Sequence, residues 1–540
     1  MELINQHTKA IMEGCKERAR DAGLSFTDES LEYIVTNRDL LELTPKVMIP
    51  TLYDYWVHDL EVLREKGKYE LYPHNPYETV INTRPPISFY NDNNPDWLNV
   101  MIFYHVLGHI DFFQNNLYFR HTWDYDFNGQ ALSDKRLIAR LRSEKGHWVD
   151  YVIEFARAID NLVDFHGELA RLYTPETATL SERLDYYFDV FLQRLKKVSM
   201  NDYLKEVARY NDCVRESGEQ GEKTFFAGAA KKYPELEAHF AKRDGTLPPK
   251  RDLLQYLMDE SPFLNRDENE WMKQVMEIIR NTAIFFQPQI RTKIMNEGWA
   301  SYWHEKLFLK DDRIRGHEVD FARVHAGVTS LPRVGLNPYA LGMRLFTWLE
   351  ELGDTGRYSL SYQRLAGVKA REEFDTGAGT GREFIFRIRE NLCDYLFVKE
   401  FIDQGFTDRH RLFVVDRRLD RQRQVWQYYV KSRKSDDYRQ MLLNTLYHPP
   451  VIEVDGERTD DGQLHLVHRF EGKQLVRDYL ANTLLGIGFF WGGAVSLETS
   501  DGVLERPSGG PAAEGAEEGE IRWQRVRYTM RDKVLSRQAL

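Results

Sequence analysis

Two histidines four residues apart are the side chains in this sequence that are best suited to metal chemistry. His105 and His109 lie in the run YHVLGHIDFF, residues 104–113, which is apolar enough to predict a buried helix. Residues four apart on a helix project from the same face, so the two imidazoles could bind one metal ion. In the alternative interpretation, they are core histidines that hydrogen-bond to backbone or carboxylate groups.

Glu297 is the best candidate for a third ligand. It lies in the helical run MNEGWASYWH, residues 295–304. The Asn-Glu-Gly-aromatic-Ala part of this run resembles the motif in which gluzincin aminopeptidases place a zinc-binding glutamate. Glu297, Ser301 and His304 share one helix face, which makes His304 a candidate fourth ligand or an outer partner of the site.

The wide separation of His109 and Glu297 in the sequence predicts a large helical insertion between the two halves of the site. The alternative is a polar core without a metal. In that case Glu297 and His304 would pair with Arg280 or Arg291, because buried charged groups need partners of opposite charge.

Val106 occupies the position at which zinc peptidases with an HExxH motif carry their catalytic glutamate. That glutamate takes a proton from the attacking water and delivers it to the leaving amine, and a valine can do neither. Either another group is the base or the site does not hydrolyse peptides. Asp111 is a poor ligand, because it projects almost opposite to His109 on a continuous helix. The candidate catalytic groups are Glu297, His304, His325 and Asp111, with Glu305 as a further candidate base.

A second cluster lies in a predicted loop. His325 is followed by Pro332 and Gly335, which break the chain before Asn337 and Tyr339. Such a loop could cap a pocket. The alternative interpretation is structural: Tyr339 packs the loop and Asn337 caps the next helix.

Composition restricts the partners and the setting of the protein. The 540 residues carry a formal net charge of -11 and contain no long basic block, which argues against nucleic acid as a partner. The three cysteines form no CxxC pair, which is typical of a reduced compartment. The N-terminal residues show no signal peptide, and no apolar stretch predicts a membrane span. The sequence therefore predicts a cytoplasmic protein.

The periodicity of apolar residues predicts a mainly α N-terminal domain, residues 1–402, with zincin-like helical elements and the His/Glu cluster. A helix is expected over residues 6–22, and another from Thr27 onward. Residues 403–540 predict a small α+β domain in the order ββαββαβ, with helices on one face of an antiparallel sheet and a disordered loop near 506–520.

The sequence also resembles the stage V sporulation protein R (SpoVR) family over almost its whole length. The resemblance rests on several long motifs. They are YETVIN at 77–82 with Pro86 and Ile87, HxxxHxDFFxNN at 105–116, MNEGWASYWH at 295–304, His325 with NPYxLG at 337–342, HLVH at 465–468 with Leu475, and WGG at 491–493.

The resemblance implies a setting but no established reaction. The family is associated with formation of the spore cortex, and relatives also occur in bacteria that make no spores. It implies a serine protein kinase and a co-encoded protein as partners.

Two functional hypotheses follow. In the first, the protein is a metal-dependent hydrolase that binds a divalent metal, zinc being one candidate, through His105, His109 and Glu297. In the second, it is a non-catalytic regulatory or scaffold protein that acts beside the kinase. Catalytic zinc keeps an open coordination position, whereas structural zinc is closed by four protein ligands. Whether His304 is a fourth ligand therefore distinguishes the hydrolase hypothesis from the non-catalytic one.

Overall fold

The computed structural model describes residues 2–27, 29–36, 79–122, 126–167, 169, 182–196, 198, 200–241, 251–420, 423–504 and 521–540. These residues form two compact units, one made of Met1–Phe165 with Leu253–Leu540 and the other of His166–Asp252. The expected loop at 506–520 lies outside the described residues. The expected domain boundary near residue 402 stays a prediction.

A four-stranded sheet precedes the histidine helix. Its strand order is β1-β2-β4-β3, with β2 and β4 parallel and the other pairs antiparallel. The helix predicted from Thr27 is wrong, because the β-branched and aromatic run LEYIV forms β2 and pairs with a strand more than fifty residues away. The elements are β1 (Glu2–Leu3), α1 (Gln6–Asp21), β2 (Leu31–Val35), β3 (Thr79–Ile81) and β4 (Ile87–Asn91).

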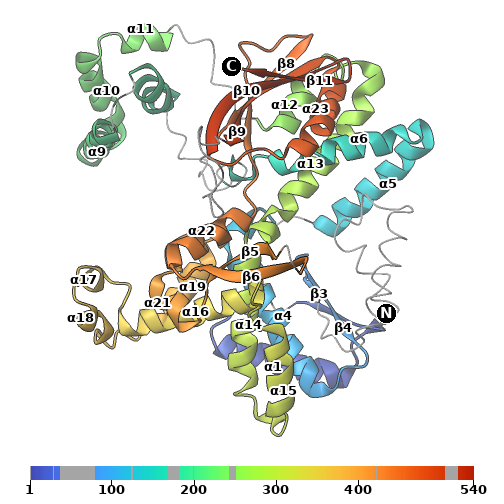
Figure 1. The fold of residues 1–540 in the computed structure, drawn as a ribbon, viewed down its shortest axis with the longest axis vertical. Helices are drawn as coiled ribbons and strands as arrows, with labels where there is room; N and C mark the ends of the chain where they lie inside the picture. Colours follow the sequence, from blue (N-terminus) through green and yellow to red (C-terminus); the bar gives the residue numbers. More distant parts are fainter. Residues whose placement is uncertain are drawn as a thin grey trace. The chain divides into compact units, whose positions relative to one another are not determined.

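Helix α4 (Asp96–Asn115) follows β4 and is buried continuously from Asn99 to Phe113. It packs against α14 (Lys293–Phe308), whose other side packs against α16 (Pro338–Thr355). Figure 1 shows α14 beside α4 and α1, with α15 and α16 close by. The predicted helices over residues 6–22 and at the two site motifs are therefore confirmed.

Glycines allow these helices to approach closely. A Cβ atom on Gly108 of α4 would lie 2.8 Å from Ala300 Cα of α14. On the other side of α14, a Cβ atom on Gly298 would lie 2.3 Å from the backbone of Gly342 in α16. A larger side chain does not fit at such distances. These small residues therefore determine how closely α14 approaches α4 and α16.

The insertion expected between the two halves of the site is present and mostly helical. It comprises η1 (Leu117–Thr122), α5 (Phe127–Lys145), α6 (Trp148–Arg157), η2 (Asp160–Leu162), α12 (Leu253–Glu260), η5 (Asp267–Asn269) and α13 (Glu270–Arg291), together with the second unit. That unit contains α8 (Glu182–Asp185), η3 (Tyr186–Leu195), α9 (Met200–Ser217), η4 (Gly218–Gln220), α10 (Gly221–Lys232) and α11 (Leu236–Ala241), packed around their own aromatic core.

Short helices complete the helical part of the first unit after α14. They are η6 (Asp312–Ile314), α15 (Glu318–Val328), α17 (Leu360–Gln363), α18 (Val368–Glu372), α19 (Gly381–Asn391), α20 (Asp394–Phe401) and α21 (Gln404–Arg409).

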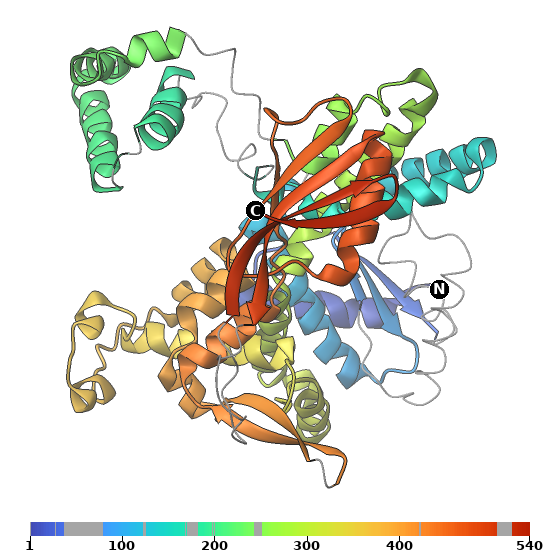
Figure 2. The ribbon, with the colours of Figure 1, turned by 45° about the horizontal axis from the view of Figure 1, so that its top comes forward.

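The C-terminal region begins with the predicted ββαββαβ order and continues with two further strands, and the overall fold class is confirmed. The antiparallel sheet expected there is in fact two sheets. One is the hairpin β5-β6, and the other has the order β11-β10-β9-β8-β7 with β8 and β9 parallel. Figure 2 shows α23 against the twisted five-stranded sheet. The elements are β5 (Val414–Asp420), β6 (Val425–Ser432), α22 (Ser435–Thr445), β7 (Val451–Val454), β8 (Gln463–Arg469), α23 (Arg477–Trp491), β9 (Ala494–Leu504), β10 (Ile521–Arg531) and β11 (Val534–Ala539).

Membrane insertion has no support in the described helices, since none of them combines the length and the apolar composition that a transmembrane segment requires.

The close approach of α4 and α14 predicts that Gly108→Ala destabilises the protein. Alanine favours a helix over glycine by about 1 kcal/mol, but overpacking in a filled core costs about 1–3 kcal/mol. We expect a lower melting temperature in differential scanning calorimetry. The matched control is Gly327→Ala in α15, where an added Cβ atom meets nothing within 4 Å. This control should leave the melting temperature unchanged or raise it, and an equal effect of both substitutions would contradict the packing argument.

Candidate metal site

The facing sides of α4 and α14 bring together the three predicted ligands. His105 and His109 come from α4 and Glu297 comes from α14, and one ligand atom of each lies within 4.8 Å of the other two. Both histidines are at most 5% exposed. Among the residues that the structure describes, this is the only such group of three His, Cys, Asp or Glu side chains.

His109 is oriented by the residue that precedes Glu297. Its Nδ1 lies 2.8 Å from Asn296 Oδ1, and its Nε2 lies 3.5 Å from Glu297 Oε2. Because an amide oxygen only accepts hydrogen bonds, His109 donates through Nδ1–H. In the neutral ring Nε2 then carries a lone pair directed toward the Glu297 carboxylate. Two acceptors facing each other repel unless a proton or a metal ion lies between them, so this pair is suited to either.

A chain of imidazoles leads away from His105. Its Nδ1 lies 2.7 Å from His304 Nδ1, and His304 Nε2 lies 2.8 Å from His325 Nδ1. His325 Nε2 in turn lies 3.6 Å from Glu305 Oε1, which is an electrostatic contact. His304 thus uses both ring nitrogens for other histidines and does not serve as a fourth ligand in this arrangement.

The negative charge of Glu305 determines which nitrogen donates in each hydrogen bond of this imidazole chain. His325 Nε2–H should point toward the carboxylate, since a lone pair there would be repelled. His325 Nδ1 then accepts from His304 Nε2–H, and His304 Nδ1 accepts from His105 Nδ1–H. The tautomer that follows places the lone pair of His105 on Nε2, the nitrogen that would bind a metal, as the Nδ1 bond of a ligating histidine usually does.

Burial keeps these imidazoles neutral. It lowers the pKa of His105 and of His304 well below the ordinary value, and the neighbouring histidines lower both further. Burial also lowers the pKa of His325, while Glu305 raises it and Arg344 lowers it. Neutral imidazole is the form that binds metals, so the burial of the cluster favours coordination.

Ser301 adds a buried polar group to the same face. It lies one helical turn from both Glu297 and His304 and is completely buried. Its Oγ has no hydrogen-bond partner within the described part of the chain. A buried hydroxyl group is normally satisfied, so this position is suited to a water molecule or a ligand oxygen.

Asp111 lies away from the cluster. It accepts hydrogen bonds from Trp299 Nε1 at 2.8 Å and from Ser25 N–H at 2.7 Å, and it lies 3.3 Å from Arg389 Nε. Burial raises its pKa to about 6 although Arg389 lowers it. These contacts give Asp111 a packing role between α4, α14 and α19, as its direction on the helix predicts. Val106, next to His105 in α4, is completely buried.

His325 lies in α15 and Tyr339 in α16, so the predicted loop is confined to the residues between these helices. Asn337 caps α16 by accepting from Ala340 N–H at 3.3 Å, as the structural interpretation predicts. Tyr339 instead stacks on His105 with 5.9 Å between ring centroids, and His325 joins the imidazole chain. Arg291 is one of the two arginines considered above as partners of Glu297 and His304. It donates a hydrogen bond to Gln287.

Sequence reasoning missed one residue of the site. Asn296 sets the orientation of His109, and its adjacency to Glu297 is the signal that could have found it. Tyr339 was predicted to lie in a cluster that could cap a pocket, but its stacking on His105 had no signal in the sequence, because it depends on how α16 packs on α14.

The fold and the cluster define a class: a mainly helical protein in which two histidines and one glutamate meet between two helices. The chain belongs to the SpoVR-like family, since the family described as "SpoVR like protein" matches residues 2–448. This finding confirms the resemblance seen in the sequence.

One curated relative is the Escherichia coli (strain K12) "Uncharacterized protein YcgB". It is 25% identical to this chain over 331 residues, which are 58% of the chain and 58% of the relative. The match therefore spans somewhat more than half of that relative's length. No solved structure matches the chain.

Asp394 holds the beginning of the helix that carries Glu297. Its carboxylate accepts from Ile294 N–H at 2.8 Å and from Met295 N–H at 2.9 Å, the first free amides of α14. A negative charge is favourable at this end of a helix. Burial nevertheless raises the pKa of Asp394 to about 7, and the charge of Glu297 also raises it, while hydrogen bonds from the amides of Ile294, Met295 and Lys293 lower it only in part.

The raised pKa of Asp394 predicts a pH-dependent contribution to stability. Because the folded state holds this proton more tightly than the unfolded state, the contribution is greatest at low pH and is lost as the pH rises toward 7. The wild type should lose roughly 2 kcal/mol relative to Asp394→Asn between about pH 5.5 and 8. Urea unfolding of both proteins at each pH measures this difference. If the difference in unfolding free energy between the two proteins stayed constant with pH, or grew in favour of the wild type as the pH rose, the raised pKa of Asp394 would be contradicted.

Proposed function

We propose that the protein binds one divalent metal ion between α4 and α14 through His105, His109 and Glu297, and that it is a metal-dependent hydrolase. The observation that carries the proposal is the convergence of these three side chains within 4.8 Å. Two imidazoles and one carboxylate are a ligand set of catalytic zinc sites, which keep one position open. The same set with open positions also binds iron(II).

The surroundings of the cluster support an open site. His304 is committed to His105 and His325, so it does not close the coordination shell. Ser301 Oγ lies on the same helix face and could hold a water molecule or a substrate oxygen. A divalent metal in such a site supplies Lewis-acid activation of water and of a carbonyl or phosphoryl group.

The imidazole chain positions His105 but does not replace the missing glutamate at Val106. His304 and His325 connect the buried His105 to Glu305, whose side chain is 38% exposed. The chain reaches the cluster only through His105, whose Nε2 would be occupied by the metal, so it offers no nitrogen that could take a proton from an attacking water. We therefore assign His304 and His325 to the positioning of His105, and leave Asp111 outside the chemistry.

A second candidate function is favoured by Val106 itself. Without a carboxylate at that position, the site could hold a metal and regulate a partner without hydrolysing peptides. The SpoVR resemblance suggests a serine protein kinase and a co-encoded protein as such partners, in sporulation and cortex formation or in stress physiology. It also suggests peptides of the cell wall or their precursors as substrates, and a cytoplasmic location.

The proposal predicts about one equivalent of divalent metal in the purified protein, removed by His109→Ala and by Glu297→Gln. Elemental analysis by mass spectrometry measures it. The matched control is His317→Ala, which removes an exposed histidine outside the cluster and should leave the metal content unchanged. Absence of metal after reconstitution would overturn the metal site, and metal without hydrolysis of cell-wall peptides would favour the regulatory function.

The orienting role of Asn296 predicts a matched pair of variants. Asn296→Ala removes the acceptor for His109 Nδ1–H and should weaken metal binding about 10–100-fold. Asn296→Asp keeps an acceptor oxygen and should retain most of the affinity. Competition with a chromogenic chelator measures both. Equal affinity of the alanine variant and the wild type would show that Asn296 does not orient the ligand.

A further inference from the structure

A separate cavity lies on the other side of α14 from the histidine cluster. Its volume is about 350 Å³, which is within the range of small-molecule sites. Its walls come from α1, α14, α16 and α19, helices that are far apart in the sequence. The lining residues are Arg18, Asp21, Ala22, Tyr302, Trp303, Lys306, Leu307, Lys310, Glu350 and Arg382.

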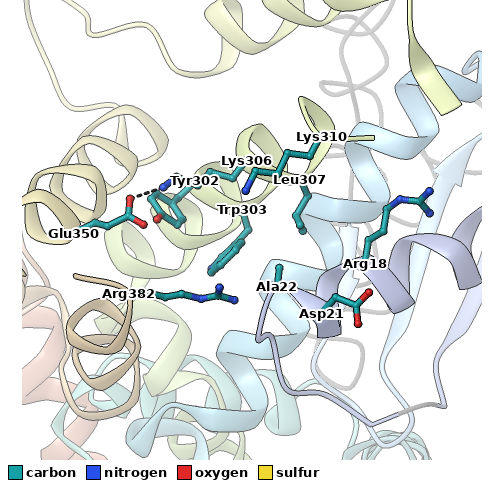
Figure 3. A pocket seen from close by; sticks show the side chains of 10 residues that line it. All are labelled: Arg18, Asp21, Ala22, Tyr302, Trp303, Lys306, Leu307, Lys310, Glu350 and Arg382. Carbon is teal, nitrogen blue, oxygen red and sulfur yellow. Dashed lines mark hydrogen bonds and ion pairs between the residues drawn. The ribbon is translucent and has the colours of Figure 1, made fainter. Parts of the chain in front are cut away.

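The charge of the cavity is opposite to that of the chain. Four cationic and two anionic side chains line it, although the whole sequence carries a net charge of -11. Two of the cations are already engaged: Lys306 donates to Glu350, and Arg18 lies 3.6 Å from Asp312. Lys310 and Arg382 have no ion pair among the described residues. Figure 3 shows Arg382 on one side of Trp303 and Lys306 and Lys310 on the other.

Trp303 supplies an apolar wall and an unused donor. It is 4% exposed, and the Arg382 guanidinium lies 5.8 Å from the centre of its ring. Its indole Nε1–H has no hydrogen-bond acceptor within the described parts of the chain.

We infer that this cavity binds a small organic molecule that carries a doubly charged anionic group, a phosphate or a dicarboxylate. Lys310 and Arg382 would bind the anionic group, because a guanidinium group matches two oxygens of a phosphate or carboxylate and an ammonium ion adds a second charge. Trp303 and Leu307 would contact the apolar part of the molecule. The inference is independent of the metal site, since it uses none of its ligands.

Isothermal titration calorimetry of the full chain with inorganic phosphate and with malonate, at constant ionic strength, tests the inference. We expect saturable binding of at least one of the two, and the better probe identifies the anionic group. The double variant Lys310→Gln/Arg382→Gln should weaken this binding about tenfold or more, because it removes both charged donors assigned to the anionic group. Both residues are exposed, so the variant should fold.

The matched control removes two exposed positive charges elsewhere, in Arg364→Gln/Lys369→Gln. It should bind the probe as the wild type does. Failure of both probes to bind saturably, or equal weakening in the control, would overturn the inference.

Discussion

The close crossing of α4 and α14 is the constraint on which the candidate site depends. The ligands lie on two helices that are separated by a long insertion, so only packing can bring them together. Gly108 against Ala300 allows the helices to approach, and Gly298 against Gly342 allows α16 to support α14 from behind. Without these small residues the helices would separate, and one metal ion could not reach both sides.

Buried polar contacts fix the register of this crossing. Asp111 on α4 binds Trp299 on α14 and lies beside Arg389 on α19, and all three side chains are almost completely buried. Asp394 binds the first amides of α14. Because a buried polar group is costly when it loses its partner, a shift of α14 along α4 would break several such contacts at once. The geometry of the cluster is therefore set by residues that would not contact a metal.

Much of the fold and of the candidate site could be predicted from the sequence because the signals were local. Helical spacing placed His105 beside His109, and Glu297 on the same face as His304. The cap formed by Asn337 was also predictable, because it depends on residues within one turn. The strand β2 was not, since its pairing with β4 depends on residues distant in the sequence. The same holds for the bond between His304 and His105, which joins residues 199 positions apart.

The absence of the usual glutamate at Val106 changes what the site could do, and the imidazole chain does not supply that base. A carboxylate base would act on a bound water directly, whereas His304 and His325 lie outside the ligand set and contact it only through His105. Their burial and neutral state suit them to orient the His105 ligand.

The most direct measurement is an anomalous difference map from crystals soaked with zinc and collected at the zinc absorption edge. The account predicts one strong peak between α4 and α14, about 2.0–2.2 Å from one nitrogen each of His105 and His109 and from an oxygen of Glu297. A zinc peak that includes His304 as a fourth ligand would contradict the open site. A map with no peak at this cluster, in crystals that bind zinc elsewhere, would contradict the metal site itself.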